Sequence, residues 1–136
     1  MNRTPRSSLA LAAVVLVLTG LAACAPGSAP DPGAAPEAPT VDDVVGIWGT
    51  PGVRGEPAME LEADGNFGGH DGCNSIGGTW QLDEEGIVRF GPIHATMMAC
   101  EGVDEWLLKA ASAELQGDSL VFSDRSGDEI GSLARG

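Results

Sequence analysis

From residue 41 onward, hydrophobic and polar residues alternate in short runs that are separated by turn-forming residues. A period of two residues is typical of strands that bury one face. The strands predicted in this way cover residues 44–48, 58–62, 67 onward, 78–82, 87–90, 119–123 and 129–133. Because successive runs lie close together in the sequence, we expect them to pair antiparallel through hairpins.

Three of the intervening segments have the composition of tight turns. They are Asp64-Gly65-Asn66, the acidic residues and glycine of 83–86, and the polar residues of 124–128. Glycine, asparagine and aspartate tolerate left-handed backbone or form bonds to their own main chain, which suits hairpin turns.

One segment has helical periodicity instead. Within residues 103–113, Trp106, Leu107 and two alanines recur at spacings of three and four, with acidic residues near the start and Lys109 nearer the end. This predicts one α-helix that covers the open side of the sheet. The predicted fold class is therefore mainly β, a small antiparallel β-sheet or partly open barrel with one packed α-helix.

The beginning of the chain has the features of a secretion signal. Arg3 and Arg6 precede an apolar run over residues 9–18, and small residues then lead to Cys24. The apolar run is too short to span a bilayer, which takes about 20 residues. Leu-Ala-Ala-Cys resembles the lipobox of bacterial lipoproteins, which implies that residues 1–23 are a lipoprotein signal peptide and that Cys24 receives acyl chains.

The segment that follows this cysteine predicts a tether. Residues 24–40 are mainly alanine, proline, glycine and serine, a composition that cannot bury enough apolar surface to fold. The folded part is then residues 41–136. We expect an extracytoplasmic monomer anchored by lipid to the cell membrane, or to an outer membrane if the cell has one.

Charge narrows the range of partners. Removal of the signal peptide leaves five of the seven basic residues against all twenty acidic ones, a formal charge of −15. Such a surface repels phosphate, which argues against nucleic acid as a partner.

Two further cysteines, Cys73 and Cys100, remain in a compartment that permits oxidation, and a disulfide between them is the first interpretation. The alternative is a pair of thiols with a redox or metal-binding role. It has less support because Cys-x-x-Cys spacing is absent from the sequence.

Three blocks of the sequence resemble the META domain family, whose members include HslJ-like heat-shock proteins. The blocks are Asp-Gly-Cys-Asn-Ser-Ile-Gly-Gly-Thr-Trp at 71–80, Ile-Val-Arg-Phe at 87–90 and Ala-Thr-Met-Met-Ala-Cys at 95–100. The resemblance also includes Gly46-Ile47-Trp48 and the strand at 118–122, so that it covers most of 41–136. It implies a compact antiparallel β-fold and supplies no catalytic residues. The family often has an arginine where this chain has Met97.

From the predicted anchor and the META resemblance, we expect a non-enzymatic protein that binds a partner or supports the cell envelope under stress. The loop residues Asn74, Ser75 and Thr96 are the candidates for a polar recognition patch, and no cofactor is expected. One alternative is a metal- or small-ligand-binding envelope protein that uses His70, Asp71 and His94. Another is an acidic inhibitor or chaperone-like partner of a basic protein.

Overall fold

A computed structural model of the chain describes residues 37–136. The predicted signal peptide, the predicted lipidation site at Cys24 and most of the predicted tether lie outside the described residues. No helix in the described part is long and apolar enough to cross a membrane. The elements in chain order are α1 (Val41–Val44), β1 (Gly46–Gly49), β2 (Ala58–Leu61), β3 (Asn66–His70), β4 (Ser75–Leu82), β5 (Ile87–Phe90), β6 (His94–Ala95), the 3-10 helix η1 (Trp106–Lys109), β7 (Ser112–Gln116), β8 (Ser119–Ser123) and β9 (Glu129–Ala134).

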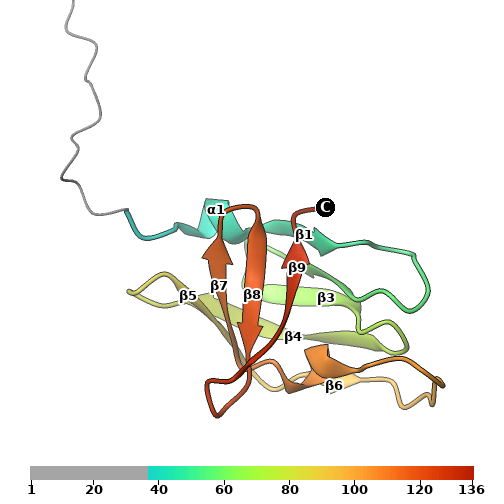
Figure 1. Cartoon of the computed structure of the whole chain (residues 1–136). Coiled ribbons are helices and arrows are strands. Elements are labelled where there is room, and N and C mark those ends of the chain that lie inside the picture. Colours follow the sequence, from blue (N-terminus) through green and yellow to red (C-terminus); the bar gives the residue numbers. More distant parts are fainter. Residues whose placement is uncertain (1–36) are drawn as a thin grey trace, which may run out of the picture. The chain divides into compact units, whose positions relative to one another are not determined.

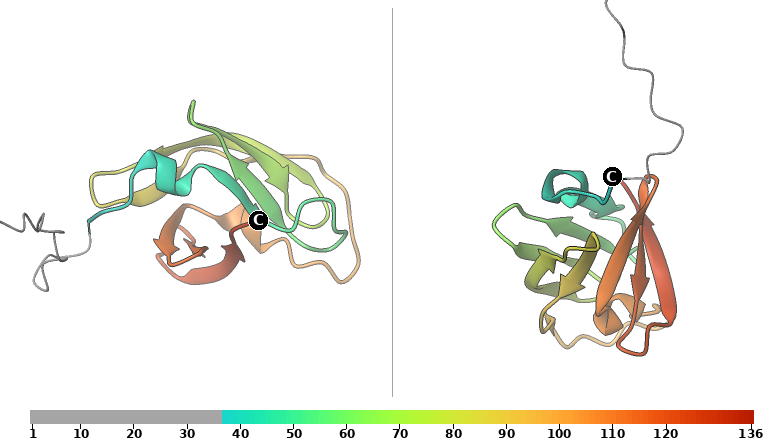
Figure 2. Two further views of the ribbon diagram at one scale, coloured as in Figure 1. Left: turned by 90° about the horizontal axis from the view of Figure 1, so that it is seen from above. Right: turned by 90° about the vertical axis from the view of Figure 1, so that its left-hand side faces the viewer.

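All strands of residues 37–136 belong to one antiparallel sheet. Its order is β1-β2-β3-β4-β5-β7-β8-β9, and β6 pairs with β4 beside this path. The sheet curls until its two end strands meet, as the view from above shows (Figures 1 and 2). Trp48 of β1 forms a single antiparallel bridge with Arg135, just after β9. The result is a nearly closed barrel, which confirms the predicted fold class.

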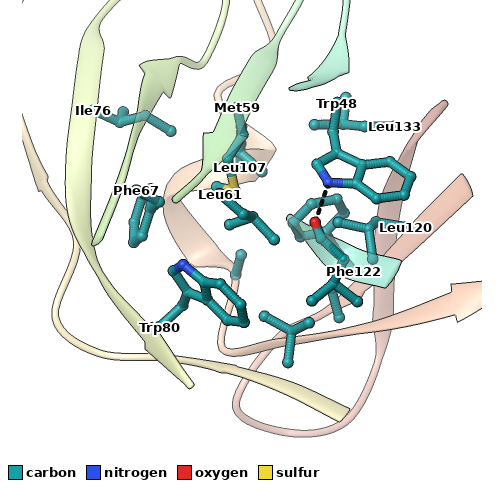
Figure 3. Close-up of a cluster of buried hydrophobic side chains, with 14 residues drawn as sticks. Trp48, Met59, Leu61, Phe67, Ile76, Trp80, Leu107, Leu120, Phe122 and Leu133 are labelled. Atoms are coloured by element: carbon teal, nitrogen blue, oxygen red, sulfur yellow. Dashed lines mark hydrogen bonds between the residues drawn. The ribbon is translucent and has the colours of Figure 1, made fainter. Parts of the chain in front are cut away.

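The interior of the curled sheet holds the hydrophobic core (Figure 3). Trp48, Leu61, Leu107 and Phe122 are fully buried there, together with residues from most of the other strands. The indole N–H of Trp48 donates to the Val44 carbonyl at 2.8 Å, so this polar group is satisfied inside the core. The alternating residues of the hairpins thus point to one common interior.

The predicted helix over residues 103–113 is wrong in extent. Only Trp106–Lys109 is helical, as one 3-10 turn, and the chain is already in strand β7 at Ser112. β7 fills the place between β5 and β8, where Ala113 lies opposite both Val88 and Phe122. Pairing on both sides of this strand outweighs the local helical preference of alanine and leucine.

The other differences are small. Residues 44–48 were predicted as a strand, but α1 ends at Val44 and β1 begins at Gly46. A hydrogen bond from the Thr40 hydroxyl to the Asp43 carboxylate, at 2.7 Å, stabilises the start of α1. β4 begins at Ser75, three residues earlier than expected, and the two-residue strand β6 was not predicted.

Candidate functional site

The turn between β3 and β4 is organised by a buried carboxylate. Asp71 is fully buried, and its Oδ1 accepts the backbone N–H groups of Cys73 at 2.8 Å and of Asn74 at 2.5 Å. Gly72 has a φ of +99°, and a Cβ there would lie 2.9 Å from the Gly55 carbonyl oxygen. Only glycine suits this position, both for its backbone angle and for the close approach. Local chemistry therefore explains the Asp-Gly-Cys-Asn turn.

Asn74 connects this turn to a distant segment. Its Oδ1 accepts the backbone N–H of Met98 at 2.7 Å and the hydroxyl of Thr96 at 3.1 Å. Its Nδ2 donates to the Glu105 carboxylate at 3.0 Å and to the Met98 carbonyl at 3.5 Å. The side chain is 3% exposed, so Asn74 holds other parts of the site rather than meeting a ligand itself.

The other two predicted recognition residues lie beside Asn74 and are exposed. Ser75 donates its backbone N–H to the Thr96 hydroxyl at 3.1 Å, and Thr96 returns its N–H to the Ser75 carbonyl at 3.0 Å. The structure thus brings together all three residues of the predicted patch, with Asn74 inside and the other two on the surface.

A disulfide ties the same segment at its far end. Cys73 and Cys100 are joined, with their Cα atoms 5.8 Å apart and a sequence separation of 27. The segment 96–100, called the 96–100 loop from here on, is therefore attached at Thr96 by hydrogen bonds and at Cys100 by a covalent bond. Both attachments lead to the Asp71–Ser75 turn.

The 96–100 loop presents two methionine side chains to solvent. Met97 is 95% exposed and Met98 is 57% exposed. Methionine is usually buried, so two adjacent exposed thioethers on a braced loop are an unusual surface. Sequence reasoning missed Met98 and also Glu105. Their backbone and carboxylate contacts with Asn74 span more than 20 residues and leave no local pattern in the sequence.

The proposed metal ligands do not form a site. Nε2 of His70 accepts the Gly52 N–H at 3.3 Å, while Oδ1 of Asp71 is used by its own turn. The ring of His94 lies against Gly77, where a Cβ would be 2.6 Å from Nε2. Among residues 37–136 there is no group of three histidine, cysteine, aspartate or glutamate residues that could hold a metal ion. The metal-binding alternative therefore has no site in this part of the chain.

Comparison with known proteins identifies the class of domain that this geometry belongs to. The family model of the META domain matches residues 40–135, so the chain belongs to the META domain family. No curated protein matches the chain. An NMR structure of a protein from Burkholderia xenovorans is similar at 17% sequence identity, covering 74% of this chain and 70% of the other, with a TM-score of 0.43.

Proposed function

We propose that this protein is a non-enzymatic, lipid-anchored META-domain protein of the cell envelope, which binds a partner through the 96–100 loop. The observation that carries the proposal is the exposed pair Met97 and Met98 on a segment attached at both ends. A lipid at Cys24 would place the domain at a membrane, and residues 25–36 would give it reach.

Bracing the 96–100 loop favours binding in two ways. The bonds from Asn74 and the disulfide already order the loop. Binding of a partner therefore does not require a further loss of conformational entropy in the loop backbone. Methionine side chains remain flexible and polarizable on this fixed backbone, and they adapt to apolar surfaces of different shapes. The site thus combines a rigid frame with adaptable contacts.

The chemistry around the loop supports binding rather than catalysis. Asp71 is enclosed by its own turn and Asn74 is committed to internal bonds, so neither is free to act on a substrate. The META domain is not a catalytic family. Display of a surface is the mechanism that these residues support.

Two measurements test the proposal separately. For the anchor, intact mass of the protein extracted from membranes with detergent should show cleavage before Cys24 and an acylated N-terminus. An unmodified Cys24 would remove the membrane part of the proposal but would leave the binding surface untested.

For the surface, a photo-crosslinking amino acid placed at position 97 should capture one discrete envelope protein in living cells. The matched control is the same amino acid at position 84, an exposed glutamate in the β4–β5 turn. Replacing Met98 with Gln in the position-97 protein should reduce the adduct. Equal capture from both positions would count against recognition by the 96–100 loop.

A second candidate is an acidic partner of a basic protein, which the large excess of acidic residues favours. Binding of that kind weakens steeply as salt rises, whereas apolar docking through methionine changes little. Repeating the crosslinking on isolated membranes, at low and at physiological salt concentration, separates the two.

A further inference from the structure

The seam between the first and last strands of the barrel is joined over a short length only. Trp48 forms one bridge with Arg135, and Gly136 donates its N–H to the Ile47 carbonyl at 2.9 Å. β9 (Glu129–Ala134) pairs along one edge with β8. Apart from that bridge, no ladder joins the other edge of β9 to a strand of residues 37–136. The last strand therefore keeps an open edge beside the seam (Figure 1).

The register identifies the main-chain groups on this edge. Arg135 donates its N–H to the Asp118 carbonyl at 2.8 Å, on the β8 side. Alternate residues of an antiparallel strand direct their N–H and C=O to opposite edges. Ser132 therefore directs both groups away from β8, as Gly136 does when its N–H reaches β1. Ser132 is exposed and can offer one donor and one acceptor to an incoming strand.

An open groove of about 640 Å³ follows this edge. Its walls are the end of β9 and the two ends of the β1–β2 connection, at Thr50 and Pro57, and Trp106 also lines it. A Cβ at Gly131 would lie 2.8 Å from the Trp106 ring, so glycine allows the close packing of the indole on the strand. The groove thus has an aromatic surface next to an unpaired strand edge.

The indole N–H of Trp106 has no hydrogen-bond partner within residues 37–136. The other two tryptophans, Trp48 and Trp80, both donate to backbone carbonyls. Tryptophan usually finds such an acceptor when it is enclosed. A main-chain carbonyl of a bound segment would satisfy this donor in the half-buried Trp106.

We propose that the seam groove binds an extended, basic segment of a partner protein, which adds as a strand to the open edge of β9. Addition of a strand to an exposed sheet edge is a common mode of peptide recognition. Ser132 would pair with the main chain of the segment, and Trp106 would contact it through its ring and its N–H. This inference goes beyond the proposed function because it needs neither the 96–100 loop nor the lipid.

The charges of the groove select a basic partner. Glu56 on one wall is exposed and makes no ion pair within the described part of the chain. The guanidinium of Arg135 is already engaged, since it donates to the carbonyls of Asp43 and Val45 and lies 4.2 Å from the centroid of the Trp48 ring. These partners are neutral and leave the positive charge of Arg135 in place, but the guanidinium also interacts electrostatically with the Asp43 carboxylate. Glu56 has no such cationic partner within residues 37–136, and the chain as a whole is negative.

Other occupants fit less well. A second copy of the chain would bring its own Glu56 and its own net negative charge to the same edge, and like charges oppose such pairing. The chain's own residues 25–36 include prolines at positions 26, 30, 32 and 36, which cannot donate to a strand ladder. An external basic segment has neither disadvantage.

Amide hydrogen exchange on the full chain, as it is isolated from the cell, tests the proposal. The probe is a blocked hexapeptide of alternating lysine and valine, and its counterpart alternates glutamate and valine. The basic probe should slow exchange at Ser132 and bind at least tenfold more tightly than the acidic one. Trp106→Phe, which keeps an aromatic ring and removes the indole N–H, should weaken binding about two- to tenfold. Glu56→Gln should weaken it about two- to fivefold, and Glu84→Gln serves as the matched control.

Several results would overturn this assignment. The assignment fails if the basic probe at millimolar concentration does not slow amide exchange at Ser132. It also fails if the basic and the acidic probe slow that exchange equally. Protection that grows with protein concentration would assign the edge to a second copy, and protection lost on deletion of residues 25–36 would assign it to the chain itself. Replacement of Met97 and Met98 with Gln should leave probe binding unchanged, so that failure of the 96–100 loop as a recognition surface remains a separate result.

Discussion

Asn74→Ala should lower the free energy of unfolding by about 2–4 kcal/mol. The Asn74 side chain makes three hydrogen bonds of normal length, to the Met98 N–H, the Thr96 hydroxyl and the Glu105 carboxylate, at 2.7, 3.1 and 3.0 Å. Each such bond contributes about 1 kcal/mol net, and a buried group left unpaired costs about 1–3 kcal/mol. The contact to the Met98 carbonyl at 3.5 Å is too long to add much.

Urea unfolding of the oxidised domain, followed by tryptophan fluorescence, measures this loss as a shift of the midpoint. Ser75→Ala is the matched control, because the contacts of Ser75 with Thr96 use its backbone and its exposed side chain is dispensable. The control should stay within about 0.5 kcal/mol of the parent protein. In Asn74→Ala, amide exchange at Met98 should also become faster, since its N–H loses its acceptor.

The reasoning would be refuted if Asn74→Ala were as stable as the Ser75→Ala control. In that case the disulfide alone would hold the 96–100 loop, and the bonds of Asn74 would be dispensable. Repeating the comparison after reduction separates the two attachments. Because both restrain the same segment, we expect their effects to be non-additive.

Three further predictions follow from other parts of the fold. Replacing Cys73 and Cys100 together with serine should lower the free energy of unfolding by about 3.5 kcal/mol, the entropy of a closed loop of this length, as measured by urea titration against the oxidised parent. Leu107→Ala should cost about 2–5 kcal/mol by the same assay, because the side chain is fully buried although η1 is only one turn long. Hydrogen bonds from the Ile87 N–H and from the Arg89 guanidinium hold the pKa of the Asp83 carboxyl below its usual value. The stability that Asp83 contributes is present above its unfolded pKa of about 3.9 and is lost as the pH falls through its lower folded value, so Asp83→Asn should flatten the acid limb of a thermal unfolding series.

Hairpins were predictable from sequence because their information is local. The β2–β3 hairpin has the alternating residues 58–62 before the turn Asp64-Gly65-Asn66, and the β8–β9 hairpin encloses the polar turn 124–128. β7 was not predictable on these grounds. The helix predicted over 103–113 included its first two residues, and pairing with β5 and β8 is what makes a strand of Ser112–Gln116.

The candidate site was likewise predictable from sequence only in part. The expected pairing of two cysteines and the family motifs indicated that the segments 71–80 and 95–100 form the candidate site. The roles within them depended on burial. Asn74 was predicted to face a ligand, yet it is enclosed by Met98 and Glu105, while the adjacent Met97 is almost fully exposed. Side chains on one loop can differ this much because the direction of each is set by distant contacts.

Local chemistry in the sequence therefore determined the β-class and the hairpins, since both depend on residue type and near neighbours. The number of cysteines left after Cys24 indicated the pairing of Cys73 with Cys100. Tertiary structure alone decided the strand identity of β7, the burial of Asn74 and the open edge at Ser132. These features arise where the sheet curls and segments far apart in sequence meet. Burial and edge pairing are properties of that closed arrangement, and no short stretch of the chain encodes them by itself.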